Sequence, residues 1–117
     1  MTNKKVLIID DQIGIRVLLM AALDKYELKD AASGREALDI ITDWQPDLVI
    51  TDLKLPGMSG LETIVKINEL GFYPETILMT AYDRLSISED IKISGFIEKP
   101  FDIEQLTTMI DDLIVNI

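Results

Sequence analysis

The stretch VLIIDD at residues 6–11 decides how this chain is expected to fold. Four apolar residues follow one another without interruption, and two aspartates come directly after them. A strand that is buried on both faces of a parallel sheet has such a continuous apolar run, whereas a strand with one face in water alternates apolar and polar residues. Similar runs occur at residues 48–50, 77–79 and, more weakly, 96–97. Residues 27–31 are more polar and are predicted to form an edge strand.

Helix-like segments lie between these runs, and most of them begin with a recognisable start signal. In a capping box a serine side chain accepts a hydrogen bond from the backbone amide three residues on, and a glutamate at that position returns one. The sequence contains three such pairs and one looser version: Ser33 with Glu36, Ser59 with Glu62, Ser86 with Glu89, and Asp102 with Gln105. A further helix is expected over residues 13–23. Strand and helix therefore alternate five times, which predicts an α/β domain with an open, doubly wound parallel sheet of five strands and five helices on its two faces.

The composition excludes several classes of function. The chain has 117 residues and a formal charge of -10, with neither histidine nor cysteine. Disulfides, zinc sites of the usual ligand type, thiol or imidazole catalysis and a phosphohistidine within the chain are therefore excluded. An acidic protein also lacks the basic surface that nucleic-acid binding requires. At this length we expect one domain, residues 1–117, without an output domain.

No targeting or membrane-spanning segment is expected. Residues 1–5 lead directly into the first apolar run rather than into a signal peptide. The longest apolar stretch, residues 13–23, contains Arg16 and is too short to span a bilayer. We therefore expect a monomeric cytoplasmic protein with no membrane partner.

The ends of the predicted strands carry the groups that indicate a function. In a doubly wound sheet the ligand binds outside the carboxyl ends of the strands. Four of the five strands end in oxygen ligands or an amine: Asp10 and Asp11, Asp52, Thr80, and Lys99. Carboxylates that lie close together repel one another, so such a cluster indicates a bound cation. Oxygen ligands suit magnesium, Mg²⁺, which keeps several waters and leaves a position for a phosphoryl oxygen.

These groups suggest roles in a magnesium-assisted phosphoryl transfer. Asp52 is the predicted nucleophile and would form an acyl phosphate. Asp10 and Asp11 would hold the metal, directly or through water. Thr80 would donate its hydroxyl hydrogen to one phosphoryl oxygen, and Lys99 would pair with another. Each residue alone is ordinary, since an aspartate at a strand end is often only a turn former; their coincidence at one edge of the sheet carries the prediction.

The same residues lie in motifs that resemble those of bacterial response-regulator receiver domains. The resemblance extends over almost the whole chain and rests on five segments: IIDDQ at 8–12, PDLVITD at 46–52, LPGMSG at 55–60, MTAY at 79–82 and KPF at 99–101. It implies a flavodoxin-like fold with strand order 2-1-3-4-5 and Asp52 as the phosphorylated residue. The implied metal ligands are the carboxylates of Asp10, Asp11 and Asp52 and the backbone carbonyl of Lys54.

The resemblance also implies a conformational switch and a cis peptide bond before Pro100. When such a domain is phosphorylated, the hydroxyl of Thr80 would move toward the phosphate and the ring of Phe96 would turn inward. An ordinary role for Phe96 as an apolar strand residue remains open.

A more specific similarity, in DDQIGIR at residues 10–16 and KPFDI at residues 99–103, is to the single-domain response regulators of sporulation phosphorelays. It implies a phosphoryl group that comes from a sensor histidine kinase and passes to a histidine of a helical-bundle phosphotransferase. The residues that match docking positions are Gln12, Gly14, Ile15, Leu18 and Tyr82. Residues 13–23 are apolar on nearly every side, which indicates either a partner on the surplus face or an unusually apolar core helix.

Three other functions compete with this interpretation. A magnesium-dependent phosphatase of the haloacid-dehalogenase type also uses an aspartate nucleophile, but that residue ends the first strand and is followed two residues later by another aspartate, where this chain has Gln12. A flavin or nucleotide binder would need a glycine-rich phosphate loop where acidic residues lie instead. The third alternative is a protein-interaction module, either switched by phosphorylation or degenerate, and no site residue is missing here. We expect no enzymatic activity beyond phosphorylation and slow dephosphorylation of the chain itself.

Overall fold

The computed structural model describes residues 4–81 and 92–115. Strands and helices follow one another in the order β1 (Lys5–Ile9), α1 (Ile13–Ala22), β2 (Glu27–Ala31), α2 (Gly34–Ile41), β3 (Leu48–Asp52), α3 (Gly60–Glu69), β4 (Glu75–Thr80), β5 (Gly95–Glu98) and α4 (Ile103–Val115). All five predicted strands are confirmed. The described ranges contain four helices, and the further helix predicted from Ser86 falls within residues 82–91, outside the described residues.

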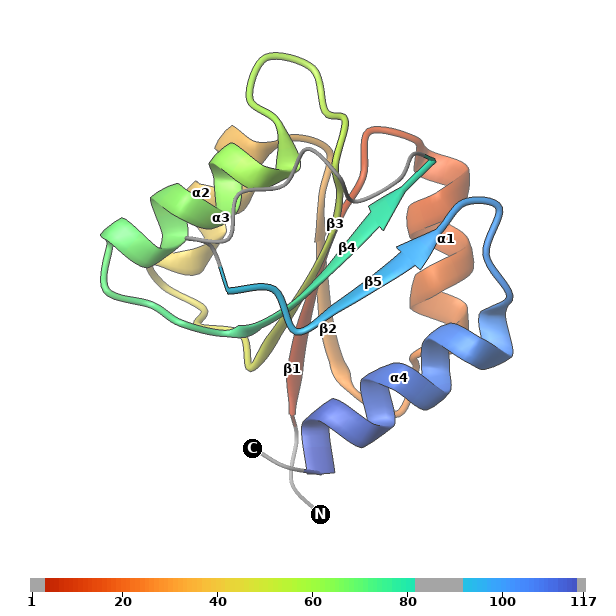
Figure 1. Cartoon of the computed structure of the whole chain (residues 1–117). Helices are drawn as coiled ribbons and strands as arrows, with labels where there is room; N and C mark the ends of the chain where they lie inside the picture. Colours follow the sequence, from red (N-terminus) through yellow and green to blue (C-terminus); the bar gives the residue numbers. More distant parts are fainter. Residues whose placement is uncertain (1–3, 82–91, 116–117) are drawn as a thin grey trace.

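The five strands form one parallel sheet in the order β2-β1-β3-β4-β5. This is the implied strand order, and the polar strand β2 lies at an edge as predicted. Helices α1 and α4 cover one face of the sheet, and α2 and α3 cover the other (Figure 1). The strand order reverses between β1 and β3, and in sheets of this kind ligands bind outside the carboxyl ends of the strands at that reversal.

The apolar runs are buried because successive side chains of a strand point to opposite faces, and both faces are covered by helices. In β1, Val6 and Ile8 pack into the core cluster that includes residues of α1 and α4. Leu7 and Ile9 pack into a second cluster, which includes Ala37 of α2. All four β1 side chains are fully buried. The two-sided burial predicted from the continuous run is therefore confirmed.

Side chains cap three of the helices at their amino ends. Ser59 and Glu62 form a complete capping box at α3. The side chains of Ser33 and Asp102 accept hydrogen bonds from backbone amides at the starts of α2 and α4. These bonds satisfy amides that a helix leaves unpaired in its first turn. The corresponding start signals in the sequence thus lie at real helix starts.

Helix α1 contains most of the longest apolar stretch of the sequence. It has 10 residues, whereas a membrane-spanning helix needs about 20. In residues 4–81 and 92–115, no helix combines the length and the apolar character required to cross a membrane.

Candidate functional site

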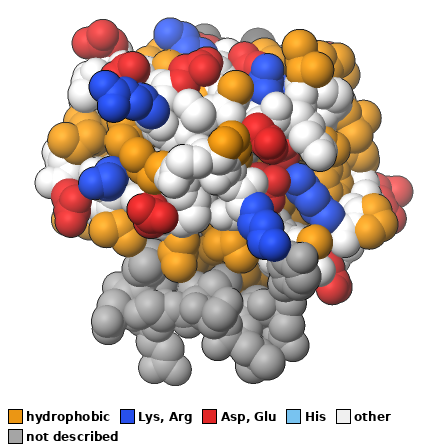
Figure 2. Space-filling model, turned by 90° about the horizontal axis from the view of Figure 1, so that it is seen from above, with side chains coloured by type: hydrophobic (Ala, Val, Ile, Leu, Met, Phe, Trp, Pro, Cys, Tyr) orange, Lys and Arg blue, Asp and Glu red, His pale blue; other side chains and the backbone are white. Residues whose placement is uncertain are grey.

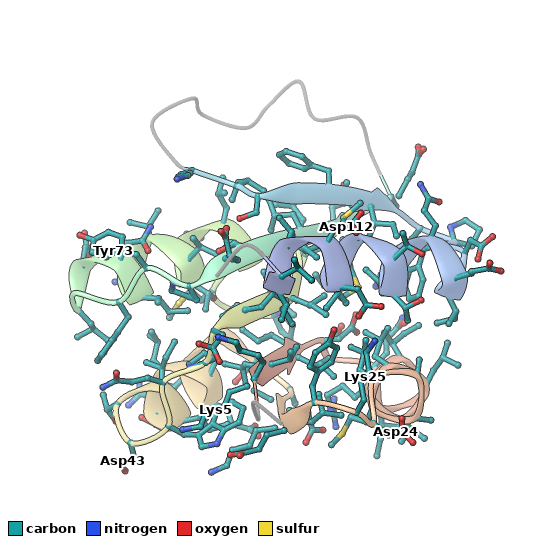
Figure 3. The ribbon with its side chains drawn as sticks, turned by 90° about the horizontal axis from the view of Figure 1, so that it is seen from below. Lys5, Asp24, Lys25, Asp43, Tyr73 and Asp112 are labelled. Atoms are coloured by element: carbon teal, nitrogen blue, oxygen red, sulfur yellow. The ribbon has the colours of Figure 1, made fainter. Side chains whose placement is uncertain are left out.

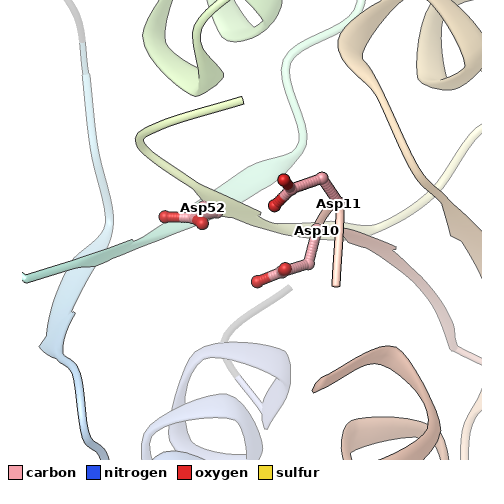
Figure 4. A group of neighbouring side chains, drawn as sticks. All are labelled: Asp10, Asp11 and Asp52. Atoms are coloured by element: carbon pink, nitrogen blue, oxygen red, sulfur yellow. The ribbon is translucent and has the colours of Figure 1, made fainter. Parts of the chain in front are cut away.

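Three carboxylates meet at the carboxyl ends of β1 and β3. Asp10 and Asp11 directly follow β1, and Asp52 ends β3. Because Ile9 lies opposite Thr51 in the sheet, the two strand ends bring these side chains together. One oxygen from each carboxylate lies within 4.8 Å of the others, and Figure 4 shows the three side chains close together at the strand ends. Asp10 is fully buried, Asp52 is partly buried and Asp11 is exposed.

Lys99 links two of these carboxylates. Its backbone amide donates to the carbonyl of Thr80 at 2.8 Å, and its Nζ lies 2.9 Å from Oδ2 of Asp10 and 3.1 Å from Oδ2 of Asp52. Burial alone would lower the pKa of the Lys99 ammonium, but hydrogen bonds to the two aspartates and their negative charges outweigh burial and raise that pKa above its ordinary value. Lys99 therefore keeps a positive charge between the two carboxylates. The bond from Lys99 to Pro100 is cis, as the resemblance implies.

Asp10 is hydrogen-bonded at its backbone as well as at its side chain. Its amide donates to the carbonyl of Ala31 at 3.1 Å, and its Oδ1 accepts from the amide of Gln12 at 2.9 Å. Its carbonyl oxygen accepts from Nη1 of Arg16 at 2.7 Å. The same guanidinium pairs with Asp30, with Nε and Oδ2 separated by 2.8 Å. The first of the three carboxylates is thus held in place by α1 and by β2.

Neither Arg16 nor Asp30 was among the predicted site residues. A signal existed for Arg16, which is the only charged residue in the apolar stretch 13–23. Asp30 carried no such signal, because an aspartate near the end of a polar edge strand is ordinary.

A glycine makes room for the backbone of Asp52. A Cβ atom built on Gly60 would lie 2.0 Å from the carbonyl oxygen of Asp52, far inside any non-bonded contact, so the start of α3 requires glycine here. The Gly60 amide donates to the carbonyl of Leu53 at 2.9 Å. The amide of Lys54, an exposed residue, donates to Oδ1 of Asp52 at 3.3 Å. The start of α3 therefore packs directly against the strand end that carries the third carboxylate.

The predicted hydroxyl lies at the same edge of the sheet. Thr80 ends β4, one residue beyond Met79, which lies opposite Asp52, and it is buried. Phe96 is a partly buried residue of β5; its inward turn on phosphorylation stays a prediction. Tyr82, which matches a docking position, lies outside the described residues.

Helix α1 carries exposed apolar side chains near the carboxylates. Three large ones are exposed: Ile13 (69%), Val17 (61%) and Leu18 (46%). Gln12 and Gly14, which also match docking positions, are exposed as well, whereas Ile15 is partly buried and packs against the core. The surplus apolar surface predicted from the sequence is thus exposed in the described part of the chain, while Leu19 packs in the core.

The donor set fits magnesium. All three clustered groups are carboxylates, the ligand type that Mg²⁺ prefers. Lys99 pairs with two of the three clustered carboxylates, Asp10 and Asp52, so the carboxylates outnumber the ammonium group, and a divalent cation would balance the excess. Asp10, Asp11 and Asp52 would hold the ion, with the carbonyl of Lys54 as a further ligand.

The surface at this end of the molecule carries both signs of charge. Figure 2 looks down from above, the side toward which β4 and β5 run in Figure 1. Acidic and basic side chains lie next to one another across this view, and hydrophobic side chains gather toward its margins. A partner that approaches from this side meets a mixed surface rather than a uniformly acidic one.

A parallel sheet of this order, with clustered carboxylates, a lysine and a threonine at its carboxyl edge, is typical of a receiver domain. The model of the response regulator receiver domain family matches residues 6–111. The chain belongs to this family. Its members are receivers of two-component systems, which bind Mg²⁺ at an acidic aspartate cluster and interact with histidine kinases and phosphotransfer proteins.

The chain is 42% identical over 111 residues to the sporulation initiation phosphotransferase F of Bacillus subtilis, with 91% of this chain and 90% of that protein covered. It is 31% identical to the regulatory protein AtoC of Escherichia coli over 91% of this chain, but it spans only 24% of that longer protein. Among solved structures, the signal receiver domain of an HD domain-containing protein from Pseudomonas fluorescens gives a TM-score of 0.89 at 26% identity, covering 98% of this chain and 97% of that one. A chemotaxis response regulator of Vibrio cholerae gives 0.88 at 28% identity, covering 96% and 99%.

Proposed function

We propose that this chain accepts a phosphoryl group onto Asp52 from the phosphohistidine of a histidine kinase, in a Mg²⁺-dependent reaction, and relays it to a histidine of a helical-bundle phosphotransferase. The observation that carries the proposal is the cluster at the strand ends, where three carboxylates converge and Lys99 holds two of them. The similarity to a protein named as a sporulation initiation phosphotransferase supports a relay in sporulation.

The chemical step takes place at a carboxylate oxygen of Asp52. That oxygen forms a bond to phosphorus while the bond between phosphorus and the donor histidine nitrogen breaks, and the electron pair of the broken bond returns to the imidazole. The product is an acyl phosphate on Asp52. In the onward transfer a histidine nitrogen of the next protein attacks the phosphorus and the carboxylate of Asp52 leaves. Both histidines belong to partners, which agrees with the absence of histidine from this chain.

The neighbouring residues position the phosphoryl group and balance its charge, the main requirements of phosphoryl transfer. When bound by Asp10, Asp11 and the Lys54 carbonyl together with Asp52, Mg²⁺ would supply positive charge next to the phosphoryl oxygens. The Lys99 ammonium, already directed at Asp52, would pair with one phosphoryl oxygen.

The buried Thr80 would donate its hydroxyl hydrogen to another phosphoryl oxygen, and this contact would couple phosphorylation to the position of Phe96 in the neighbouring strand β5. Phosphorylation would then change the surface near β4 and β5. No separate substrate is turned over in this scheme, because the protein acts only on its own aspartate.

The exposed side of α1 is the proposed docking surface for the partner helix. Its apolar residues Ile13, Val17 and Leu18 are exposed, and α1 begins two residues after Asp11. A charged substitution there, Leu18→Lys, is expected to slow phosphorylation by a kinase or phosphotransferase while leaving phosphorylation by acetyl phosphate unchanged. Equal slowing with both donors would contradict the docking role, since a small donor needs no docking helix.

The proposal is tested by incubating the protein with acetyl phosphate and Mg²⁺ and measuring its intact mass. We expect one phosphoryl adduct that hydroxylamine removes, that needs Mg²⁺, and that Asp52→Ala abolishes. An adduct that persists in Asp52→Ala would refute the assignment of the acceptor. Continuous turnover of a phosphomonoester without an adduct would favour the phosphatase instead.

A further inference from the structure

Arg16 and Asp30 form a charged pair next to the backbone of Asp10. The proposed function gives neither residue a role. Arg16 of α1 places Nε 2.8 Å from Oδ2 of Asp30 in β2 and Nη1 2.7 Å from the carbonyl oxygen of Asp10. The Arg16 side chain is 14% exposed. A guanidinium is a rigid planar fork, so two bonds made from a mostly buried position fix its orientation.

The end of β2 supports the Asp10 backbone in two ways, once directly and once through Arg16 of α1. The Asp10 amide bonds directly to the carbonyl of Ala31, and the Asp10 carbonyl is reached by Arg16, which the preceding residue, Asp30, orients. Because Asp10 is fully buried, its carbonyl needs a hydrogen-bond partner within the protein. Arg16 supplies that partner at the peptide group that joins Asp10 to Asp11.

We propose that Arg16, oriented by Asp30, is a positioning residue for the magnesium site. It fixes the peptide between Asp10 and Asp11, and through this peptide it sets the directions of the two carboxylates that would hold Mg²⁺. The inference rests on the proposed function, since it assigns residues that support the same site. Arg16 bonds the backbone of a ligand residue, so it acts through that residue and is not itself a metal ligand.

The charge of Arg16 and its positioning role affect Mg²⁺ binding in opposite directions. A positive charge near a cation site repels the cation, so loss of that charge alone would tighten binding. Loss of the hydrogen bond to the Asp10 carbonyl would weaken it, because groups that orient metal ligands without touching the metal typically change affinity by about 10–100-fold. The sign of the change in affinity therefore separates the two effects.

The experiment is calorimetric titration of the full chain with MgCl₂. Arg16→Met is expected to raise the Kd for Mg²⁺ roughly tenfold, the lower end of the range for groups that act through a ligand. Asp30→Asn is expected to raise it less, and the double variant should bind no more weakly than Arg16→Met, because Asp30 acts through Arg16. Arg35→Met, at an exposed residue of α2, removes the same charge and should leave the Kd unchanged.

A Kd for Arg16→Met that equals or falls below the wild-type value would overturn the inference, and so would additive effects of the two substitutions. Thermal unfolding in EDTA provides the structural readout. A role confined to stability would lower the unfolding midpoint and leave the Kd of the folded protein unchanged. If Arg16→Met does not fold, Asp30→Asn decides by the same criterion. Absence of Mg²⁺ binding by the wild type would refute the proposed function and this inference with it, whereas wild-type binding that Arg16→Met retains would refute the inference alone.

Discussion

The two ends of the sheet arrange their carboxylates differently. At the amino end two acidic side chains have separate partners: Asp47 accepts from the Lys5 amide at 2.9 Å, and Glu75 accepts from the Ser94 hydroxyl. At the carboxyl end three aspartates are crowded together and two of them share Lys99. A carboxylate that accepts from its own neutral donor is stable without a cation. Carboxylates that are crowded together repel each other, and a bound cation reduces this repulsion. The carboxyl end therefore has the groups that a cation site requires.

The amino end of the sheet also has a cavity. A cavity of about 630 Å³ is lined by Asp47, Tyr73, Ser94 and neighbouring residues near the starts of β4 and β5. Figure 3 views this end from below, with Tyr73 by α3 and Lys25 between α1 and α4. The convergent carboxylates and the lysine lie at the opposite end of the same strands, and their chemistry, rather than the cavity, indicates the site.

The largest expected effect comes from removing the shared lysine. Lys99→Met leaves Asp10 and Asp52 without their cation. We expect a loss of about 3 kcal/mol of stability in EDTA, the lower end for a broken buried pair, because Lys99 and Asp52 are partly exposed. Mg²⁺ should stabilise this variant more than the wild type, since a dication can replace the ammonium. Urea unfolding with and without MgCl₂ measures both effects.

Lys25→Met is the matched control, because the Lys25 pair with Asp111 is solvent-exposed and should contribute less than about 1 kcal/mol. Two results would contradict repulsion among the carboxylates at the carboxyl end. One is a Lys99→Met variant as stable as the wild type in EDTA, and the other is a variant that Mg²⁺ stabilises no more than it stabilises the wild type.

The next effect comes from the close contact between Gly60 and the backbone carbonyl of Asp52. Gly60→Ala places a methyl group against the Asp52 carbonyl, and since backbone cannot yield easily, we expect a loss of about 1–3 kcal/mol together with slower phosphorylation by acetyl phosphate. Gly14→Ala is the control, because a Cβ at Gly14 has no atom within 4 Å; it should leave stability equal or slightly higher. Equal unfolding midpoints for both variants would contradict the close packing.

Removing one carboxylate from each end of the sheet should change different properties of the protein. Asp47→Ala removes the acceptor for the Lys5 amide and should cost about 1 kcal/mol without changing the Kd for Mg²⁺. Asp11→Asn removes an exposed charge from the crowded end, so in EDTA it should stabilise the protein by about 0.5 kcal/mol while weakening Mg²⁺ binding. If Asp11→Asn destabilised the metal-free protein, repulsion among the three carboxylates would be contradicted.

The smallest effect is a pH dependence at the amino end. Burial alone would raise the pKa of Asp111, but hydrogen bonds from Tyr26 and Lys25 and the Lys25 charge lower it. A carboxyl whose pKa is lowered on folding adds stability above its ordinary pKa, and this stability is lost as the pH falls through the lowered value. Asp111→Asn should therefore destabilise at neutral pH and have less effect in acid, as urea midpoints at several pH values would measure. A difference from wild type that is constant with pH would exclude this linkage.

Much of the fold could be predicted because strand periodicity is local. The continuous run at residues 6–9 indicated a strand covered on both faces, and the polar segment 27–31 indicated an edge. Strand ends were less predictable. β4 begins at Glu75, two residues before the apolar run, because Glu75 and Thr76 pair with β3 through their backbone regardless of their polar side chains.

The carboxylates and the lysine of the site could also be predicted, since a parallel sheet brings its strand ends to one edge. Their supports could not. The need for glycine at position 60 arises from the Asp52 backbone, and the Arg16 pair with Asp30 depends on how closely α1 approaches β2. Such contacts are set by packing between elements, which the pattern within one element does not contain.

The most direct test is chemical identification of the phosphorylated residue. Borohydride reduces an aspartyl phosphate to homoserine, so the protein is treated with acetyl phosphate and Mg²⁺, reduced, digested and sequenced by tandem mass spectrometry. We predict homoserine at position 52 alone, and none when Mg²⁺ is omitted. Homoserine at position 10 or 11, or unmodified Asp52 in a protein that carries the phosphoryl group, would contradict the assignment of Asp52 as the acceptor.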